Sequence, residues 1–312
     1  MRRAVFILAG LFALPVPAAH AQQTFTFFAS VLDTKGDPVA TLKPTDFAIR
    51  EGGVDAKVLK ADPIEWPVKV QILVDNGTGV GSESLQFLRN GVRGLVQALP
   101  PGTDITLVST APQPRQVVKA TTDKDMVLQG VDRITPDSGA ARFSEGLMEA
   151  VDRIDKEKNS KGKKGEDNKA VANYFPVIVI VGSTAAEGSQ VMDRDFQKLL
   201  QRIQQDAVTV HVVMLSSTNQ SQNSISGEIQ TQVGTAVTKQ SGGRYEAIAA
   251  PSRIATLLPE VGQQITASNT RQSHQYRITY ERPAGKSGPV GQIEMGVPAG
   301  MRASLSIDGH LP

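Results

Sequence analysis

One carboxylate stands at a position where α/β proteins commonly bind ligands. A largely apolar run, Val68 to Val74, ends on Asp75 and breaks into a glycine-rich loop that contains Gly77, Thr78 and Gly79. A run of this kind, bounded by turn residues, predicts a buried strand of a parallel sheet. Ligands of open α/β sheets bind at the carboxyl ends of such strands. Asp75 is therefore a candidate ligand-binding residue, and the alternative is a loop residue that caps the following turn.

Three other chemistries do not fit the chain. Gly77, Gly79 and Gly81 lack the spacing of a dinucleotide-binding fingerprint, and the chain has no Gly-x-x-x-x-Gly-Lys-Ser/Thr phosphate-binding loop. The chain also lacks the Gly-x-Ser-x-Gly nucleophile motif of hydrolases. The histidines are scattered along the sequence, at His20, His211, His274 and His310. Because no catalytic constellation is found, we expect a protein that is not an enzyme and that needs no cofactor.

Alternating helix and strand patterns define the setting of Asp75. Apolar positions at helical spacing predict helices over residues 84–99, 123–131, 143–154, 193–205 and 252–266. Runs rich in β-branched residues predict strands over residues 104–109, 115–120, 175–181 and 208–215. This alternation predicts an α/β fold with a doubly wound, Rossmann-like parallel sheet and right-handed crossovers.

Both chain ends have a different pattern. The stretch from Thr24 to Gly53 alternates and is rich in residues that favour strands, and extended runs return near the carboxyl terminus. Trp66 lies between Pro63 and Pro67, and we expect it to pack this linker onto the α/β domain. The predicted division is an amino-terminal β element over 22–65, an α/β domain over 66–268, and a carboxyl-terminal β tail over 269–312 that packs with the first element.

The first residues have the pattern of an export signal. Arg2 and Arg3 precede an apolar run, and Ala19 and Ala21 supply the small residues that a signal peptidase reads. We therefore expect a signal peptide over residues 1–21 and a protein that is exported to the periplasm or secreted. The chain has no cysteine for a lipid anchor, and no later segment has the length and apolarity of a membrane span.

The net charge argues against nucleic acid as a partner. Removal of Arg2 and Arg3 with the signal lowers the number of basic residues from 33 to 31, which equals the 31 acidic residues. Nucleic-acid-binding domains are usually basic. We therefore expect the mature chain to bind no nucleic acid.

The strand that leads into Asp75, Gly77, Thr78 and Gly79, followed by a helix, resembles the opening of a von Willebrand factor A domain. In that family the loop reads Asp-x-Ser-x-Ser and holds a divalent metal ion, whereas here Gly77 and Gly79 occupy both serine positions. The segment from Thr45 to Gly53 is similar to one bacterial branch of the family, the VWFA-related proteins known largely from Acidobacteria. The resemblance spans the mature chain and implies a protein partner, because A domains commonly bind proteins.

The resemblance also implies a metal site assembled from three loops, and each loop departs from the family pattern. Where the second loop of the family has Gly-Gly-Thr, this chain has Gly139, Ala140 and Ala141, and Gly182 stands in place of the aspartate of the third loop. Only Asp75 remains, whereas Mg²⁺ takes about six oxygen ligands. We therefore expect metal-independent binding of a protein partner through loops 76–82, 137–142 and 182–189. The candidate binding residues in these loops are Asp75, Thr78, Ser82, Arg142, Ser183 and Thr184.

Three alternatives stay open at this point, beside an enzyme of unknown type whose activity would be abolished by Asp75→Ala. In the first, hydroxyl and carboxylate oxygens from the same loops rebuild a Mg²⁺ site at Asp75 for metal-dependent adhesion; the replacement ligands would be Thr78, Ser82, Ser183, Thr184 and Glu187. In the second, Arg142 forms an ion pair with Asp75 and replaces the charge of the metal. In the third, the chain is a structural subunit of a cell-envelope assembly, and its β tail pairs with the sheet edge of a neighbour.

Overall fold

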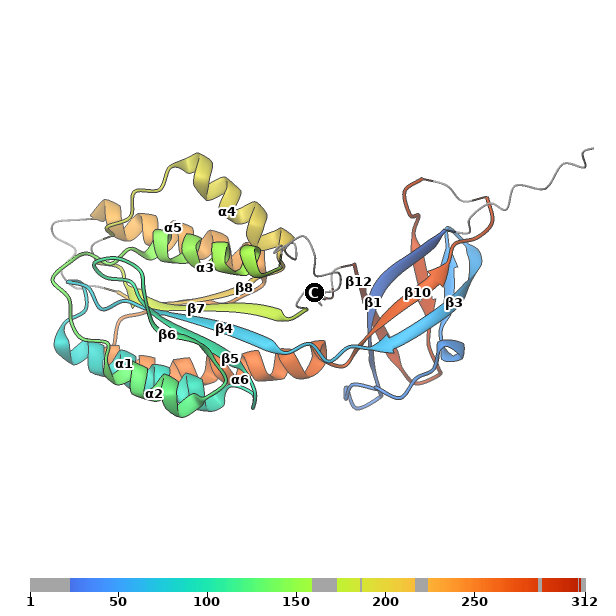
Figure 1. Cartoon of the computed structure of the whole chain (residues 1–312), viewed down its shortest axis with the longest axis horizontal. Coiled ribbons are helices and arrows are strands. Elements are labelled where there is room, and N and C mark those ends of the chain that lie inside the picture. Colours follow the sequence, from blue (N-terminus) through green and yellow to red (C-terminus); the bar gives the residue numbers. More distant parts are fainter. Residues whose placement is uncertain are drawn as a thin grey trace, which may run out of the picture.

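The computed structural model describes residues 23–158, 173–185, 187–216, 224–285, 288–307 and 309, with the backbone alone for 224–228. The chain forms two units, each built on its own six-stranded sheet. The two units lie side by side along the long axis of the molecule (Figure 1). The predicted signal peptide over residues 1–21 lies outside the described residues.

The α/β unit contains a mostly parallel sheet. Its strands are β4 (Val68–Val74), β5 (Asp104–Ser109), β6 (Arg115–Thr121), β7 (Phe175–Ser183), β8 (Thr209–Leu215) and β9 (Tyr245–Ile248). They lie in the order β6-β5-β4-β7-β8-β9. Strand β6 at one edge is antiparallel to β5, and the other neighbouring strands are parallel. The connection over residues 110–114 explains this reversal, because a parallel pairing needs a crossover of about a dozen residues or more.

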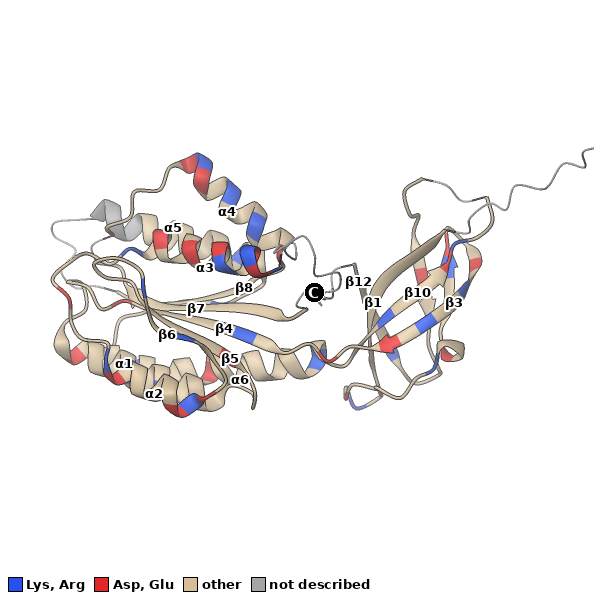
Figure 2. Cartoon of the chain, in the orientation of Figure 1, with Lys and Arg blue, Asp and Glu red and all other residues tan. Residues whose placement is uncertain are grey.

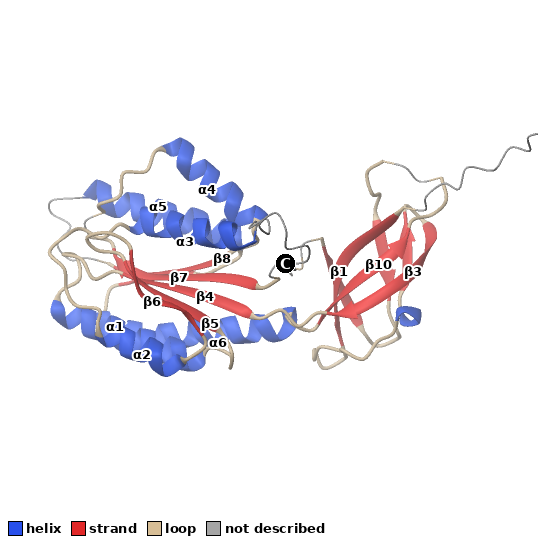
Figure 3. Ribbon diagram, viewed as in Figure 1, coloured by secondary structure: helices blue, strands red, loops and turns tan. Residues whose placement is uncertain are grey.

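Helices cover both faces of this sheet (Figure 3). One face packs against α1 (Ser82–Ala98), α2 (Lys124–Asp132) and α6 (Ile254–Gln272). The other face packs against α3 (Phe143–Lys158), α4 (Asp193–Gln205) and α5 (Ser224–Ser241). Because the central strand β7 has helices on both sides, all nine of its residues are buried, and it carries no charged side chain (Figure 2). The predicted doubly wound α/β fold is confirmed.

Glycines allow α1 and α6 to pack closely under the sheet. A Cβ atom at Gly91 would lie 2.7 Å from the carbonyl oxygen of Ile254, and one at Gly262 would lie 2.8 Å from the Cβ atom of Ala98. Helix α6 continues to Gln272, beyond the predicted end at residue 266. The predicted domain boundary between residues 268 and 269 therefore falls inside a helix. No helix in the described part of the chain is both long enough and apolar enough to cross a membrane.

The β element is an antiparallel sheet made from both ends of the chain. Its strands are β1 (Thr24–Leu32), β2 (Ala48–Glu51), β3 (Val54–Pro63), β10 (Gln275–Glu281), β11 (Ile293–Gly296) and β12 (Arg302–Ser306). They lie in the order β11-β2-β3-β10-β1-β12, so β10 pairs between β3 and β1. Alternating side chains of these strands form a separate apolar core that includes Phe27, Ile49, Tyr276 and Ile278. Short 3-10 helices cover Pro44–Asp46 and Pro251–Arg253.

Trp66 packs at the junction of the two units. The centroid of its ring lies 5.1 Å from that of Phe28 in β1 and 5.4 Å from that of Phe175 in β7. The side chain therefore contacts one aromatic residue from each sheet. Packing of the linker by Trp66, which its position between Pro63 and Pro67 predicts, is confirmed.

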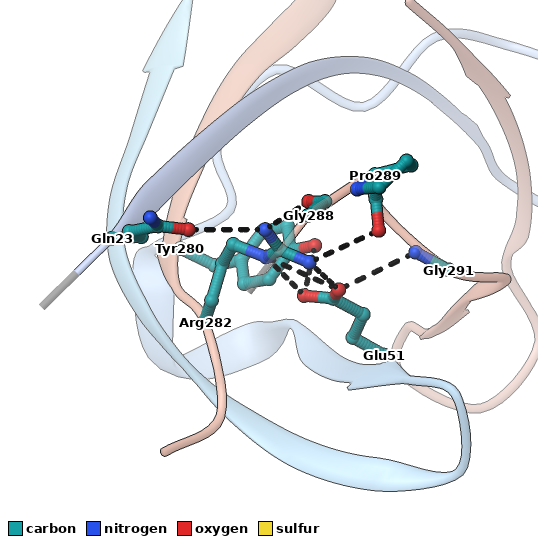
Figure 4. A network of polar contacts seen from close by, with 7 residues as sticks. All are labelled: Gln23, Glu51, Tyr280, Arg282, Gly288, Pro289 and Gly291. Atoms are coloured by element: carbon teal, nitrogen blue, oxygen red, sulfur yellow. Dashed lines mark hydrogen bonds and ion pairs between the residues drawn. The ribbon is translucent and has the colours of Figure 1, made fainter. Parts of the chain in front are cut away.

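A buried ion pair connects the two ends of the chain inside the β element (Figure 4). Nε of Arg282 donates to both carboxylate oxygens of Glu51, at 3.2 and 3.1 Å, and Nη2 donates to Oε1 at 2.5 Å. The hydroxyl of Tyr280 donates to Oε2 of the same carboxylate at 3.0 Å. Glu51 is 1% exposed and Arg282 is 6% exposed. The hydrogen bonds from Arg282, with that of Tyr280, lower the pKa of Glu51 to about 2 despite its burial.

The remaining donors of Arg282 are also used. Nη1 donates to Oε1 of Gln23 at 3.2 Å and to the carbonyl oxygen of Gly288 at 2.9 Å, and Nη2 donates to the carbonyl oxygen of Pro289 at 3.3 Å. A guanidinium group has five N–H donors. The arginine is therefore fully paired, and it joins the start of β1, the end of β2 and the segment that precedes β11.

Candidate functional site

The three loops that the family resemblance singles out meet at the carboxyl edge of the α/β sheet. The amide of Thr78 donates to the carbonyl oxygen of Gly139 at 3.0 Å, and that of Asp137 donates to Asn76 at 2.7 Å. The amide of Gly188 donates to the carbonyl oxygen of Ala141 at 2.7 Å. Backbone hydrogen bonds therefore join the loops after β4 and β7 to the loop before α3. We refer to this surface as the loop edge.

Asp75 lies beneath the loop edge and is 5% exposed. Its Oδ1 accepts a hydrogen bond from the amide of Gly77 at 2.8 Å. Its Oδ2 accepts from the amide and from the hydroxyl of Ser183, each at 3.1 Å. The carboxylate thus caps the turn after β4, as expected for the alternative of a turn-capping loop residue. It also joins that turn to the end of β7.

The charge state of Asp75 is set by two opposing effects. Burial, the larger effect, raises its pKa, because it disfavours the charged form, and the hydrogen bonds from Gly77 and Ser183 lower it. The net direction is a pKa above the ordinary value of an aspartate. The negative charge of Glu187 adds to this rise. Asp75 therefore has only neutral donors as partners, and no cationic side chain contacts it within the described residues.

The glycines that replace the serines of the family stand where the loops touch. A Cβ atom at Gly77 would lie 2.7 Å from the carbonyl oxygen of Gly139. A Cβ atom at Gly79 would lie 2.2 Å from the Cβ atom of Ala185 and 2.5 Å from the hydroxyl of Ser183. Side chains at these positions would force the loops apart. The backbone of this chain is thus packed around glycine, and serine ligands do not fit the observed arrangement.

These residues are a poor fit for the divalent metal that the family implies. The described residues contain no group of three or more histidine, cysteine, aspartate or glutamate side chains that could hold a metal ion. Asp75 is the one carboxylate left from the family motif, and both of its oxygens already accept hydrogen bonds from Gly77 and Ser183. A cation would have to displace these donors and would still lack most of its roughly six oxygen ligands.

Arg142 does not form the ion pair with Asp75 that was one alternative. Its Nη1 donates to both oxygens of Glu145, at 3.0 and 2.8 Å, and its Nε donates to the carbonyl oxygen of Pro112 at 2.8 Å. Arg142 immediately precedes α3, so Glu145 lies one turn away and is the nearer partner. The carboxylate of Glu145 also accepts from the amide of Gln190 at 3.1 Å. Arg142 and Glu145 therefore hold three loop segments together.

The other candidate residues have different surroundings. Thr78 and Ser82 are exposed at the loop edge, whereas Ser183 is buried and bonded to Asp75. Thr184 is half-buried beside it. Oε1 of Glu187 accepts from the amide of Ser189 at 2.8 Å, and Oε2 accepts from Nε2 of Gln230 at 3.1 Å. The loops bring all of these residues to one edge of the sheet.

Sequence analysis missed Asn76 and Glu145, which organise the loop edge. Nδ2 of Asn76 donates to the carbonyl oxygen of Thr135 at 2.8 Å, and its Oδ1 accepts from the amide of Ala111 at 3.1 Å. Asn76 follows Asp75 directly at the strand end, and Glu145 lies three residues after Arg142 at the start of a predicted helix. Both positions were visible in the sequence as polar residues next to the candidate site.

Comparison with known proteins agrees with this architecture. The family model described as von Willebrand factor type A domain matches residues 70–242. No curated protein matches the chain significantly. Among solved structures, a von Willebrand factor type A protein from Catenulispora acidiphila is similar at 10% sequence identity with a TM-score of 0.50. The alignment covers 93% of this chain and 74% of that one.

Two further similar structures come from Bacteroides. BatB, a conserved hypothetical protein from Bacteroides thetaiotaomicron, has 10% identity and a TM-score of 0.45, with 64% of this chain and 100% of that chain covered. An aerotolerance-related membrane protein from Bacteroides fragilis has 11% identity and a TM-score of 0.43, with 63% and 99% covered. Since the family model matches more than half of the sequence, over the strands and loops that surround Asp75, the chain belongs to the von Willebrand factor type A domain family.

Proposed function

We propose that this chain is an exported, non-catalytic module that binds a protein partner through the loop edge, and that this binding needs no metal ion. The observation that carries the proposal is the engagement of Asp75, whose two oxygens accept hydrogen bonds from Gly77 and Ser183. Family members are known for binding proteins at this edge through a metal. Here the same edge is closed by hydrogen bonds of the protein itself.

Two features make the loop edge suitable as a contact surface. Loops held on a rigid scaffold are common sites of recognition, and these loops are joined to one another by backbone bonds at Gly139, Asn76 and Ala141. Thr78 and Ser82 present exposed hydroxyls there. Little ordering is therefore needed when a partner binds, which lowers the entropic cost of association.

The direct test of metal independence is calorimetry. Mg²⁺ and Mn²⁺ are titrated into the mature protein, residues 22–312, beside the Asp75→Ala variant. We expect no saturable heat in either protein, because both oxygens of Asp75 already accept hydrogen bonds from Gly77 and Ser183, which a cation would have to displace. Saturable binding that disappears in Asp75→Ala would instead establish metal-dependent adhesion as the mechanism.

The contact surface is tested by affinity capture from envelope and culture-medium fractions of the source organism. A double variant, Thr78→Arg with Ser82→Arg, places bulk and charge on the loop edge. Thr24→Arg with Thr122→Arg is the matched control, because both of these threonines are exposed and lie away from the loop edge. We expect the loop variant to lose a partner that the control and an EDTA-treated sample retain. Capture that the loop variant leaves unchanged would show that another surface binds the partner.

A second candidate function is supported by the edge of the β element. Strand β12 is the last strand of its sheet, and its outer side pairs with no described strand. Such an edge can add a strand from a neighbouring molecule. In that case the chain would be a structural subunit of an envelope assembly. Light scattering over a range of protein concentrations separates the two functions, because a subunit assembles as concentration rises and a monomeric binding module does not.

A further inference from the structure

A second candidate site lies at the opposite edge of the α/β sheet, where the β element meets the α/β unit. A cavity of about 500 Å³ opens there, which is within the range of small-molecule sites. Its walls come from β1 and β12 on one side, and from the first residues of β4, β7 and β8 with the last turns of α6 on the other. Junctions between structural units are common positions for ligand sites. The cavity shares no residue with the loop edge.

The residues that line this cavity have a consistent chemistry. None of the described lining residues is acidic, which disfavours a cationic ligand. Hydroxyl groups come from both units: Ser30, Thr209, Ser241, Ser268 and Ser304. Primary amides come from Gln264, Asn269 and Gln272 of α6. The apolar part of the lining comes from Leu32, Val68, Val177 and Ile265. Such a lining suits a compact ligand with several hydroxyl groups.

Two of these residues have unsatisfied polar atoms. The hydroxyl of Ser30 and Oδ1 of Asn269 are buried, and neither has a hydrogen-bond partner among the described residues. Ser30 itself is only 2% exposed. Burial of a polar atom without a hydrogen-bond partner is unfavourable. Both residues line the cavity, and a rotation of either side chain would bring its polar atom to a ligand there.

His211 lines the cavity and carries no positive charge there. It lies in β8, is 3% exposed, and its Nδ1 accepts a hydrogen bond from the amide of Arg244 at 3.2 Å. That bond places the hydrogen of the neutral ring on Nε2. Burial, with a smaller contribution from the charge of Arg244, lowers the pKa of His211 to about 4. The ring is therefore uncharged at neutral pH and cannot balance an anion.

Arg271 supplies the positive charge. It lies in the last turn of α6, and the structure gives it no ion pair or hydrogen bond with any described residue. A free guanidinium beside a cavity without acidic residues favours a carboxylate, which it can bind through two parallel N–H donors. We propose that the cavity binds a small hydroxylated organic anion of the sugar-acid class, with its carboxylate on Arg271 and its hydroxyl groups among the serine and amide side chains.

Calorimetry with three probes tests both parts of this proposal. D-Glucuronate carries the carboxylate and the hydroxyls, D-glucose carries hydroxyls alone, and acetate carries the carboxylate alone. We expect saturable binding of glucuronate, with glucose and acetate each weaker by roughly tenfold or more, since a charge-assisted hydrogen bond is worth about 1.5–3 kcal/mol. Trp66 is the only tryptophan of the chain and lies at the same junction, so its fluorescence gives a second readout.

Variants of the lining residues test whether glucuronate binds in this cavity. Arg271→Gln is expected to weaken glucuronate binding by roughly tenfold or more, and Ser268→Phe to block it by filling the cavity. Arg277→Gln is the matched control, because Arg277 is an exposed arginine of β10 that does not line the cavity. Circular dichroism verifies that each variant is folded.

Three results would overturn the proposal: no saturable binding of glucuronate to the folded protein, equal affinity in Arg271→Gln, or binding of glucose or acetate as tight as that of glucuronate. Because the cavity lies away from the loop edge, these results do not bear on the protein-binding function. Loss of partner capture in the loop-edge variant, in turn, would leave the affinity for glucuronate unchanged.

Discussion

Asp75 and Glu51 are two buried carboxylates of one chain, and their pKa values are shifted in opposite directions. Asp75 is 5% exposed and Glu51 is 1% exposed, so burial disfavours the charge of both. Asp75 accepts hydrogen bonds from neutral groups of Gly77 and Ser183, and its pKa is raised. Glu51 is paired with the guanidinium of Arg282, and its pKa is lowered to about 2.

The difference shows that the partner, more than the burial, decides whether a buried carboxylate keeps its charge. In the β element a side chain supplies the positive charge, and that pair holds strands from both chain ends together. At the loop edge Asp75 has only neutral donors, and no described arginine contacts it. A buried carboxylate therefore joins strands through an ion pair in one place and joins loops through neutral hydrogen bonds in the other.

The largest effect is expected at Glu51. Glu51→Gln leaves the guanidinium of Arg282 buried without its counter-charge, and we expect a loss of about 3–5 kcal/mol in the free energy of unfolding. Urea unfolding followed by circular dichroism measures it. A double variant, Glu51→Gln with Arg282→Met, removes the buried charge and is expected to recover part of the loss. A change below about 1 kcal/mol in the single variant, the range of exposed pairs, would contradict the assigned strength of the ion pair.

The dependence of folding stability on pH distinguishes the two carboxylates, because their pKa shifts have opposite signs. Glu51 has a pKa of about 2 in the folded protein against 4.5 for an ordinary glutamate. Its contribution to stability is therefore complete above pH 4.5 and is lost as the pH falls towards 2. The raised pKa of Asp75 has the opposite effect on stability. Because the folded state binds the proton of Asp75 more tightly than the unfolded state does, protonation of Asp75 favours the folded state as the pH falls. We expect the stability difference between the native chain and Glu51→Gln to shrink over this acid range; a constant difference would argue against the assignment.

The smallest of the three effects is expected at Asp75. An asparagine there can accept from Ser183 with its single oxygen, but its amide group then faces the N–H of Gly77, so Asp75→Asn should lose about 1–3 kcal/mol. Asp137→Asn is the matched control, because Asp137 accepts only from the amide of Gly139 and is less buried. Thermal unfolding of both variants measures the effect. Equal stability of the two would mean that the donors around Asp75 contribute little.

Much of the fold could be predicted because it rests on local patterns. The run that forms β7 is apolar along its whole length, and the buried positions of α1, Leu85, Leu88, Val92 and Leu95, recur at helical spacing. The strands at both chain ends alternate, which predicts a sheet with one covered face. These signals need no knowledge of what each element contacts, and the doubly wound sheet with its flanking β element follows from them.

The contacts of the site could be predicted less well, because they depend on register and on distant partners. Ser183 was expected near Asp75 from the position of its loop, but its role as a double donor was not. Arg142 is held by Glu145, a local competitor that a comparison with the family motif does not reveal. The pairing of Glu51 with Arg282 joins residues 231 positions apart, and it becomes visible only when the strands of the β element are aligned.

The arrangement of β1 and β12 determines how the protein bears tension. The α/β unit is inserted between β3 and β10, so a pull on the chain at Thr24 and at Ser306 reaches it only through the β element. Ser306 pairs with Phe28 and Arg302 pairs with Leu32, so the end of β12 lies towards the start of β1. Such a pull peels the two strands apart one hydrogen bond at a time. The outer strand would yield at low force, and the α/β unit with its loop edge would stay folded while it does.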